Sequence, residues 1–183
     1  MILEPDFVTR FYLDSIRDGL REQTPAELTP PRVTAAAPAA LGSEEIGFFL
    51  FAMGEDRAAG VSPTERLTLN ARTAGQRARR ESWNLDFVLA ARSGRKPDEA
   101  PLAEQAMLAG AMRALEYAQR IDRPRQRPVT AALANDPDVS VSQELIRHDL
   151  PDALQAALRA SPYGLRPAIG YRARTVVNWM ERD

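Results

Sequence analysis

Residues 169–179 have the sequence IGYRARTVVNW, in which polar and apolar side chains alternate. Arg172, Arg174 and Asn178 fall on even-numbered positions, and the odd-numbered positions are apolar or aromatic apart from one threonine. A period of two is typical of a β-strand with one face against a core. Residues 82–91 alternate in the same way, so two long strands of a mostly antiparallel sheet are predicted at the centre of the fold.

Shorter apolar segments predict the other strands. Residues 46–53 are apolar almost throughout, which is typical of a strand covered on both faces. Residues 32–37, 129–134 and 139–145 are further candidates, and the last two are joined by a strong turn signal at 135–138.

Three segments have helical periodicity. The first begins near Asp6 and ends near Thr24, and the second spans about 98–121. The third spans about 150–160, with Asp149 as its expected N-cap. The second helix is expected to lie close against the sheet through its small residues, which are Ala103, Gly110 and Ala114.

The order of these elements predicts an α+β fold. We expect a mostly antiparallel sheet of about four to six strands, packed against an N-terminal helix, a long central helix and a short third helix. The 183 residues suffice for a single domain over 1–183. Residues 57–80 lack clear periodicity and are expected to form a long loop or arm, with a short strand candidate at 66–70.

Composition excludes several kinds of chemistry. The chain has no cysteine and a single histidine, His148, so disulfides, thiolate metal sites and cysteine nucleophiles are excluded. His148 is expected to be a structural or surface residue, and Glu44 and Glu45 to mark a solvated entry to a strand. No glycine-rich phosphate loop is present. We therefore predict neither an enzyme nor a cofactor or metal site.

The charges are unevenly distributed although the net charge is only −1. Residues 1–56 carry four arginines against ten acids, and residues 57–96 carry nine basic residues against three acids. Such segregation favours a head-to-tail partner. Trp179 is a core residue by default and an interface anchor as the alternative. The candidate interface residues are Arg72, Arg77, Arg79, Arg80, Arg123, Arg125, Arg127, Arg172, Arg174 and Trp179.

No signal peptide or membrane span is expected. Residues 1–6 contain neither a basic region nor an apolar core, and the longest apolar run, 46–53, is too short to cross a bilayer. The protein is therefore expected in the cytoplasm.

Several stretches together resemble the tail terminator, or cap, proteins of extracellular contractile injection systems, which share a domain of unknown function. The resemblance runs through most of the chain. The stretches that carry it are IGFFLF (46–51), WNLDFVL (83–89), LAEQAMLAGAMRAL (102–115), LPDAL (150–154), SPYGL (161–165) and IGYRARTVV (169–177). The last three are the most specific.

The resemblance implies a structural protein that forms a ring, typically a hexamer, at the distal end of an inner tube and its contractile sheath. Such a ring stops growth of the tube and anchors the last sheath layer. The implied partners are copies of the chain itself, the sheath protein and the inner tube protein, in a phage tail-like particle that is assembled in the cytoplasm and can be released from the cell. Two alternatives stay open: a phage or prophage tail-completion protein, and a small cytosolic nucleic-acid-associated protein that uses the arginines of 57–80 and 120–127.

Overall fold

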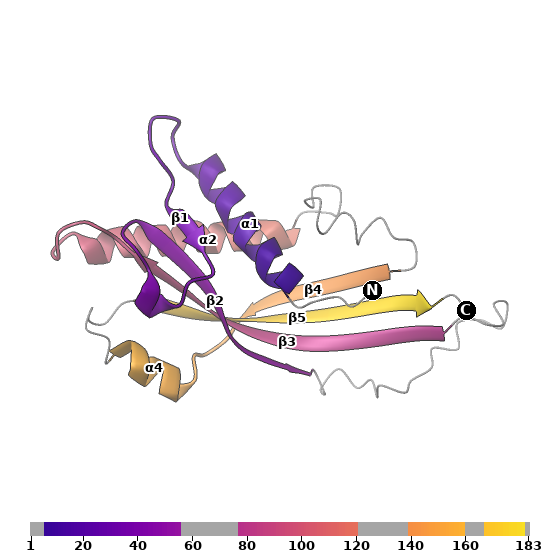
Figure 1. The fold of residues 1–183 in the computed structure, drawn as a ribbon. Coiled ribbons are helices and arrows are strands. Elements are labelled where there is room, and N and C mark those ends of the chain that lie inside the picture. Colours follow the sequence, from indigo (N-terminus) through magenta and orange to yellow (C-terminus); the bar gives the residue numbers. More distant parts are fainter. Residues whose placement is uncertain (1–5, 56–76, 121–138, 160–166, 182–183) are drawn as a thin grey trace.

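The computed structural model describes residues 6–55, 77–120, 139–159 and 167–181 (Figure 1). Five strands and three α-helices are found in these residues. In chain order the elements are α1 (Asp6–Gln23), β1 (Arg32–Thr34), the short 3-10 helix η1 (Pro38–Ala40), β2 (Glu45–Glu55), β3 (Arg77–Arg92), α2 (Ala100–Arg120), β4 (Val139–Arg147), α4 (Asp152–Arg159) and β5 (Ala168–Glu181).

The strands form one sheet in the order β1-β2-β3-β5-β4. β1 runs parallel to β2, and every other pair is antiparallel. The two strands predicted most clearly from the sequence, β3 and β5, pair at the centre, with Phe87 opposite Tyr171 and Leu85 opposite Ala173. The predicted α+β class and mostly antiparallel sheet are confirmed.

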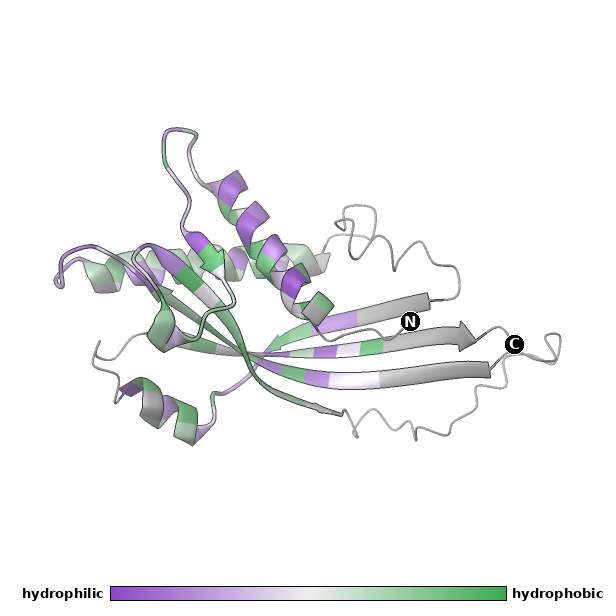
Figure 2. Ribbon diagram, viewed as in Figure 1, coloured by the Kyte–Doolittle hydropathy of each residue, from purple (hydrophilic) through white to green (hydrophobic). Residues whose placement is uncertain are grey.

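The main core lies between the sheet and the helices α1 and α2, which share one face of the sheet (Figure 1). Leu85, Phe87 and Tyr171 are all buried on this face, as the alternation predicts. Tyr12 of α1 packs edge-on against Phe48, whose ring stacks on Phe87 at a centroid distance of 4.4 Å. Burial raises the pKa of Tyr12 above its ordinary value. In Figure 2 apolar residues predominate where the strands pass close to these helices.

The helices α1 and α2 cross at very short range. A Cβ added at Gly19 would lie 2.4 Å from the Cβ of Ala114, and one at Gly110 would lie 3.0 Å from the Leu20 side chain. The small residues of α2 were expected to face the sheet, and that prediction is wrong for Gly110 and Ala114. They face α1 because only glycine and alanine let the two backbones approach this closely.

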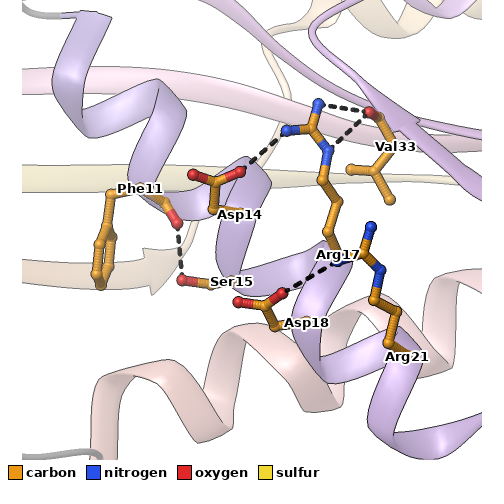
Figure 3. Close-up of polar contacts among 7 residues, drawn as sticks. All are labelled: Phe11, Asp14, Ser15, Arg17, Asp18, Arg21 and Val33. Carbon is orange, nitrogen blue, oxygen red and sulfur yellow. Dashed lines mark hydrogen bonds and ion pairs between the residues drawn. The ribbon is translucent and has the colours of Figure 1, made fainter. Parts of the chain in front are cut away.

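An arginine ties α1 to the edge of the sheet (Figure 3). Arg17 donates hydrogen bonds from Nη2 and Nε to the carbonyl oxygen of Val33, at 2.9 and 3.3 Å. Its Nη1 contacts Asp14 Oδ1 at 2.9 Å. A guanidinium satisfies both partners at once because its donors point in fixed directions, so α1 holds the short strand β1 in place.

Several predicted boundaries are corrected. β1 ends at Thr34 rather than 37, and β2 is buried only in its first half, since Ala52 and Met53 are exposed. β3 already begins at Arg77, so the end of the expected arm over 57–80 is strand.

The N-cap predicted at Asp149 is also wrong. α4 begins at Asp152, and the Pro151 carbonyl accepts the first hydrogen bonds, from the backbone N–H groups of Leu154 and Gln155. Proline lacks an N–H and suits the first turn of a helix, which places the start of α4 later than the acid at 149.

The remaining predictions lie outside the described residues. They are the strand candidates at 66–70 and 129–134, the turn at 135–138, the basic stretch after α2 and most of the arm over 57–80. Among the described residues, no helix has both the length and the apolar character needed to cross a membrane.

Candidate functional site

The sheet has two unlike halves. One end lies under α1 and α2, and β3, β5 and β4 run on well past both helices (Figure 1). We call the second part the projecting half. It consists of residues 51–55, 77–84, 139–143 and 174–181, whose strand pairing is continuous from Arg77 opposite Glu181 to Asn84 opposite Arg174.

The projecting half collects several of the predicted interface residues. In the register of the sheet Arg77 lies opposite Glu181, Arg79 opposite Trp179, and Trp179 in turn opposite Val139 of β4. Arg80 lies in the same strand, opposite Asn178. The backbone therefore brings these residues into one three-stranded segment, as a shared interface requires. Four other predicted residues lie outside the described part of the chain: Arg72, Arg123, Arg125 and Arg127.

Arg172 and Arg174, also predicted, are engaged within the chain. Arg172 contacts Asp86 through two hydrogen bonds, Nε to Oδ1 at 2.6 Å and Nη2 to Oδ2 at 3.0 Å. Arg174 Nη1 lies 3.9 Å from Glu144 Oε2. These pairs link the three strands β3, β5 and β4 on the sheet face opposite α1 and α2. Arg172 thus acts first as a cross-strand link.

Buried polar atoms mark the boundary between the halves. Six buried side-chain atoms have no hydrogen-bond partner among the described residues, and Ser82 Oγ, Asn84 Oδ1, Gln143 Nε2 and Thr175 Oγ1 are among them. Buried polar atoms normally have partners. In the register of the sheet Ser82 and Asn84 lie on one face, and Thr175 and Gln143 lie on the other. The polar character begins where the helices stop covering the sheet.

Both outer edges of the sheet are open in the described part of the chain. β1 pairs with β2 only from Glu45 to Gly47, so the edge of β2 beyond Gly47 faces no strand there. At the other side, β4 pairs with β5 alone. An open edge presents backbone N–H and carbonyl groups that can pair with a further strand.

A second polar cluster lies at the start of β2, where Glu44 is exposed as predicted and Glu45 is not. Glu44 has a positive φ of 52° and accepts hydrogen bonds from Ser93 Oγ and the Gly94 N–H. Glu45, expected to be solvated, is buried. Its pKa is held below the ordinary value, chiefly because the Gly42 N–H donates to its carboxylate at 2.6 Å. These acids fix the corner between β2 and the end of β3.

Neither this corner nor the surroundings of His148 supplies a metal-binding cluster among the described residues. The described residues contain no group of three His, Cys, Asp or Glu side chains that could hold a metal ion. His148 is exposed, and its backbone N–H donates to the Gly170 carbonyl at 2.9 Å. The main chain of His148 therefore holds this residue against β5. What the described geometry offers is surface: two strand edges and a polar extension of the sheet.

Comparison with known proteins gives a match to a solved structure. No family model matches the chain, and no curated protein matches it. Among solved structures, the chain is similar to the PVC sheath/tube terminator of an extracellular contractile injection system in its extended state, determined by cryo-EM. The identity is 11% and the TM-score 0.51. The match covers 100% of this chain and 58% of that one, so this chain spans less than two thirds of that terminator.

At this identity the likeness shows a shared fold. The resemblance predicted from the sequence is therefore confirmed at the level of the fold: the chain is similar in fold to a sheath/tube terminator.

Proposed function

We propose that this protein is a structural tail terminator of a contractile injection system. It forms a ring, expected to be a hexamer, at the distal end of the inner tube and sheath, ends growth of the tube and anchors the last sheath layer. The observation that carries the proposal is the match of the entire chain to a sheath/tube terminator. The proposal therefore rests on similarity of the fold and not on one motif.

The surfaces of the described residues suit such a role. The open edges of β2 and β4 offer main-chain hydrogen bonds to a neighbouring strand, for example one from a sheath subunit. The segregated charge of the sequence favours contacts between unlike surfaces, which close into a ring when the rotation between subunits permits it. Neither property requires chemistry, which agrees with a non-enzymatic part of a particle.

The first test is the oligomeric state of the purified protein. We expect a ring of about six subunits that persists on dilution, measured by native mass spectrometry and seen by negative-stain electron microscopy. A protein that is monomeric at every concentration, and that neither sheath nor tube protein recruits into rings, would contradict the proposal.

The second test concerns the arginines that begin β3. Reversing the charge of Arg77, Arg79 and Arg80 together should block assembly at moderate salt, because we propose that they meet an acidic surface of a neighbour or of the tube. Arg95, exposed outside the projecting half, provides the control as Arg95→Glu. Normal rings and capped particles in the triple variant would refute the role of this segment.

The same preparations test the nucleic-acid alternative. Retention on DNA that falls steeply with salt and depends on these arginines would favour that alternative over the terminator. A phage or prophage tail-completion protein would also form rings, and it is distinguished by the particle with which the ring co-purifies.

A further inference from the structure

The two strands at the outer edges of the sheet expose large apolar side chains. Met53 of β2 is 57% exposed and Ile146 of β4 is 40% exposed, although such side chains are usually buried. On β2 the exposure is continuous, because none of the side chains in 49–53, with the sequence FLFAM, is buried. Neither 48–55 nor 139–147 contains a lysine or a proline, the residues with which proteins commonly block an open edge. Both edges therefore suit a further strand.

The two edges run in opposite directions. The strands β2, β3, β5 and β4 follow one another across the sheet, and each neighbouring pair is antiparallel. A second copy placed beside the first in the same orientation therefore brings its β2 antiparallel to β4 of the first. Antiparallel pairing is slightly more stable per residue than parallel pairing. Rotation about a ring axis repeats this placement, so the topology permits a sheet that continues from copy to copy.

The two edges also match in position. β1 pairs only with the start of β2, so residues 48–55 face no other strand on that side within the described part of the chain. In the register of the sheet Ala52 and Ile146 lie in one row, which passes through Asp86 and Arg172. Both side chains at the ends of this row are exposed. Without a shift between copies, Ala52 of one copy therefore meets Ile146 of the next.

The register of β2 against β3 shifts between Leu50 and Ala52, which is a β-bulge. A bulge bends its strand and increases the twist, and bulges are common at the rims of closed sheets. Regular pairing with β3 resumes at Ala52 and continues to Glu55. The bulge thus supplies curvature, which a sheet that closes around an axis needs, and leaves an extended edge beyond it.

We infer that β4 of one copy pairs with β2 of the next copy in the ring. This inference rests on the proposed ring and names one of its subunit contacts. A second copy is favoured because one repeated contact covers both edges, whereas a strand of another protein covers one edge. Pairing of β2 with β2 would close a dimer and leave β4 open. Edge pairing buries less surface than a stable interface needs, so it is one part of a larger contact.

Cross-linking of the full-length protein tests the pairing. The chain has no cysteine, so a disulfide can form only between introduced residues. Ala52→Cys combined with Ile146→Cys should give a ladder of oxidised oligomers up to the full ring, because each copy then has one cysteine on each edge. Ala52→Cys with Glu144→Cys samples the neighbouring register on the same face. The controls are the single variants and Ala52→Cys with Arg95→Cys, which lies on neither edge.

An introduced charge tests the apolar character of the edges. Met53→Lys and Ile146→Lys should each weaken the ring by about tenfold or more, because a lysine on an edge strand opposes strand addition. The dilution midpoint in native mass spectrometry measures this change, and circular dichroism verifies that each variant is folded. Leu102→Lys is the matched control, because this leucine of α2 is 72% exposed and lies on neither edge, and its midpoint should equal that of wild type.

A ladder from either double-cysteine variant, with weaker rings in both lysine variants, supports the inference. Wild-type rings without a cross-link in either pair overturn it and leave the proposed function intact, as does a dimer formed by Ala52→Cys alone. Lysine variants that keep their rings and lose only the sheath protein show that a sheath strand uses the edge, which also overturns it. A wild-type chain that never forms rings overturns both the inference and the proposed function.

Discussion

The two halves of the sheet differ in the polarity and exposure of their side chains. Under α1 and α2, the strands carry apolar side chains that are fully buried, such as Phe48, Phe87 and Leu89. In the projecting half, Met53 is 57% exposed, and at its boundary Ser82 and Thr175 bury hydroxyl oxygens that have no hydrogen-bond partner among the described residues. Apolar packing dominates the covered half, whereas polar groups are frequent in the projecting half, which is the part that we propose for assembly.

We therefore expect the two halves of this continuous sheet to have different roles. Hydrophobic burial in the covered half provides the stability of the subunit. The pairing of β3 with β5 continues beyond the helices, to the positions of Arg79 and Trp179. Changes in the covered half should therefore affect folding, and changes in the projecting half should affect assembly.

The largest effect is expected from Phe87→Ala. Its ring stacks on Phe48 and contacts Tyr12, so removing it should lower the free energy of unfolding by about 3–5 kcal/mol. Urea denaturation followed by fluorescence measures the change. Met53→Ala, at an exposed position of the projecting half, is the control and should stay within about 0.5 kcal/mol of wild type.

Two glycines provide the next comparison. Gly19→Ala should destabilise the fold by about 1–3 kcal/mol, because the new Cβ would lie 2.4 Å from Ala114 and the helices must separate. Gly54→Ala in the projecting half meets nothing within 4 Å and should be neutral or slightly stabilising. Equal thermal midpoints for the two variants would contradict the close crossing of α1 and α2.

The cross-strand ion pairs should have smaller effects. Asp86→Ala removes a bidentate partner of the half-buried Arg172 and should lower stability by about 1–2 kcal/mol. Glu144→Ala, whose pair with Arg174 is longer and more exposed, should cost less than about 1 kcal/mol. Chemical denaturation of both variants ranks them, and the reverse order would show that the Asp86 pair is not the stronger link.

The smallest effect concerns pH. The pKa of Glu45 is lowered in the folded chain, so the unfolded chain binds its proton more readily as the pH falls below about 4.5. The stability that this group contributes is present at neutral pH and is lost as the pH falls through the lowered value. Glu45→Gln should therefore flatten the acid limb of a stability profile slightly. An unchanged slope would contradict the stabilising contact with Gly42.

The sequence predicted what depends on local periodicity. Alternation in β3 and β5 correctly placed Leu85 and Tyr171 toward the core, and the helical spacing located α1. It did not reveal what the small residues of α2 would meet, because a glycine such as Gly110 indicates a close approach but not its partner.

Contacts between distant residues were also inaccessible. The pair of Asp86 with Arg172 depends on the register of two strands that are far apart in the chain. Glu44 is exposed as predicted, but Glu45 was also expected to be solvated, because charged residues usually are, and it is buried. Only the fold brings the Gly42 N–H to the Glu45 carboxylate. The candidate interface was predicted as a set of arginines, and the structure separates Arg172, engaged in the sheet, from those that begin β3.

The most direct test of the account is the length of the inner tubes in cells that make the particle but lack this protein. If the chain is the terminator, tubes and sheaths should vary widely in length and lack a cap density at the distal end, and the wild-type gene should restore both. Tubes of normal, uniform length with capped ends in its absence would contradict the proposed function.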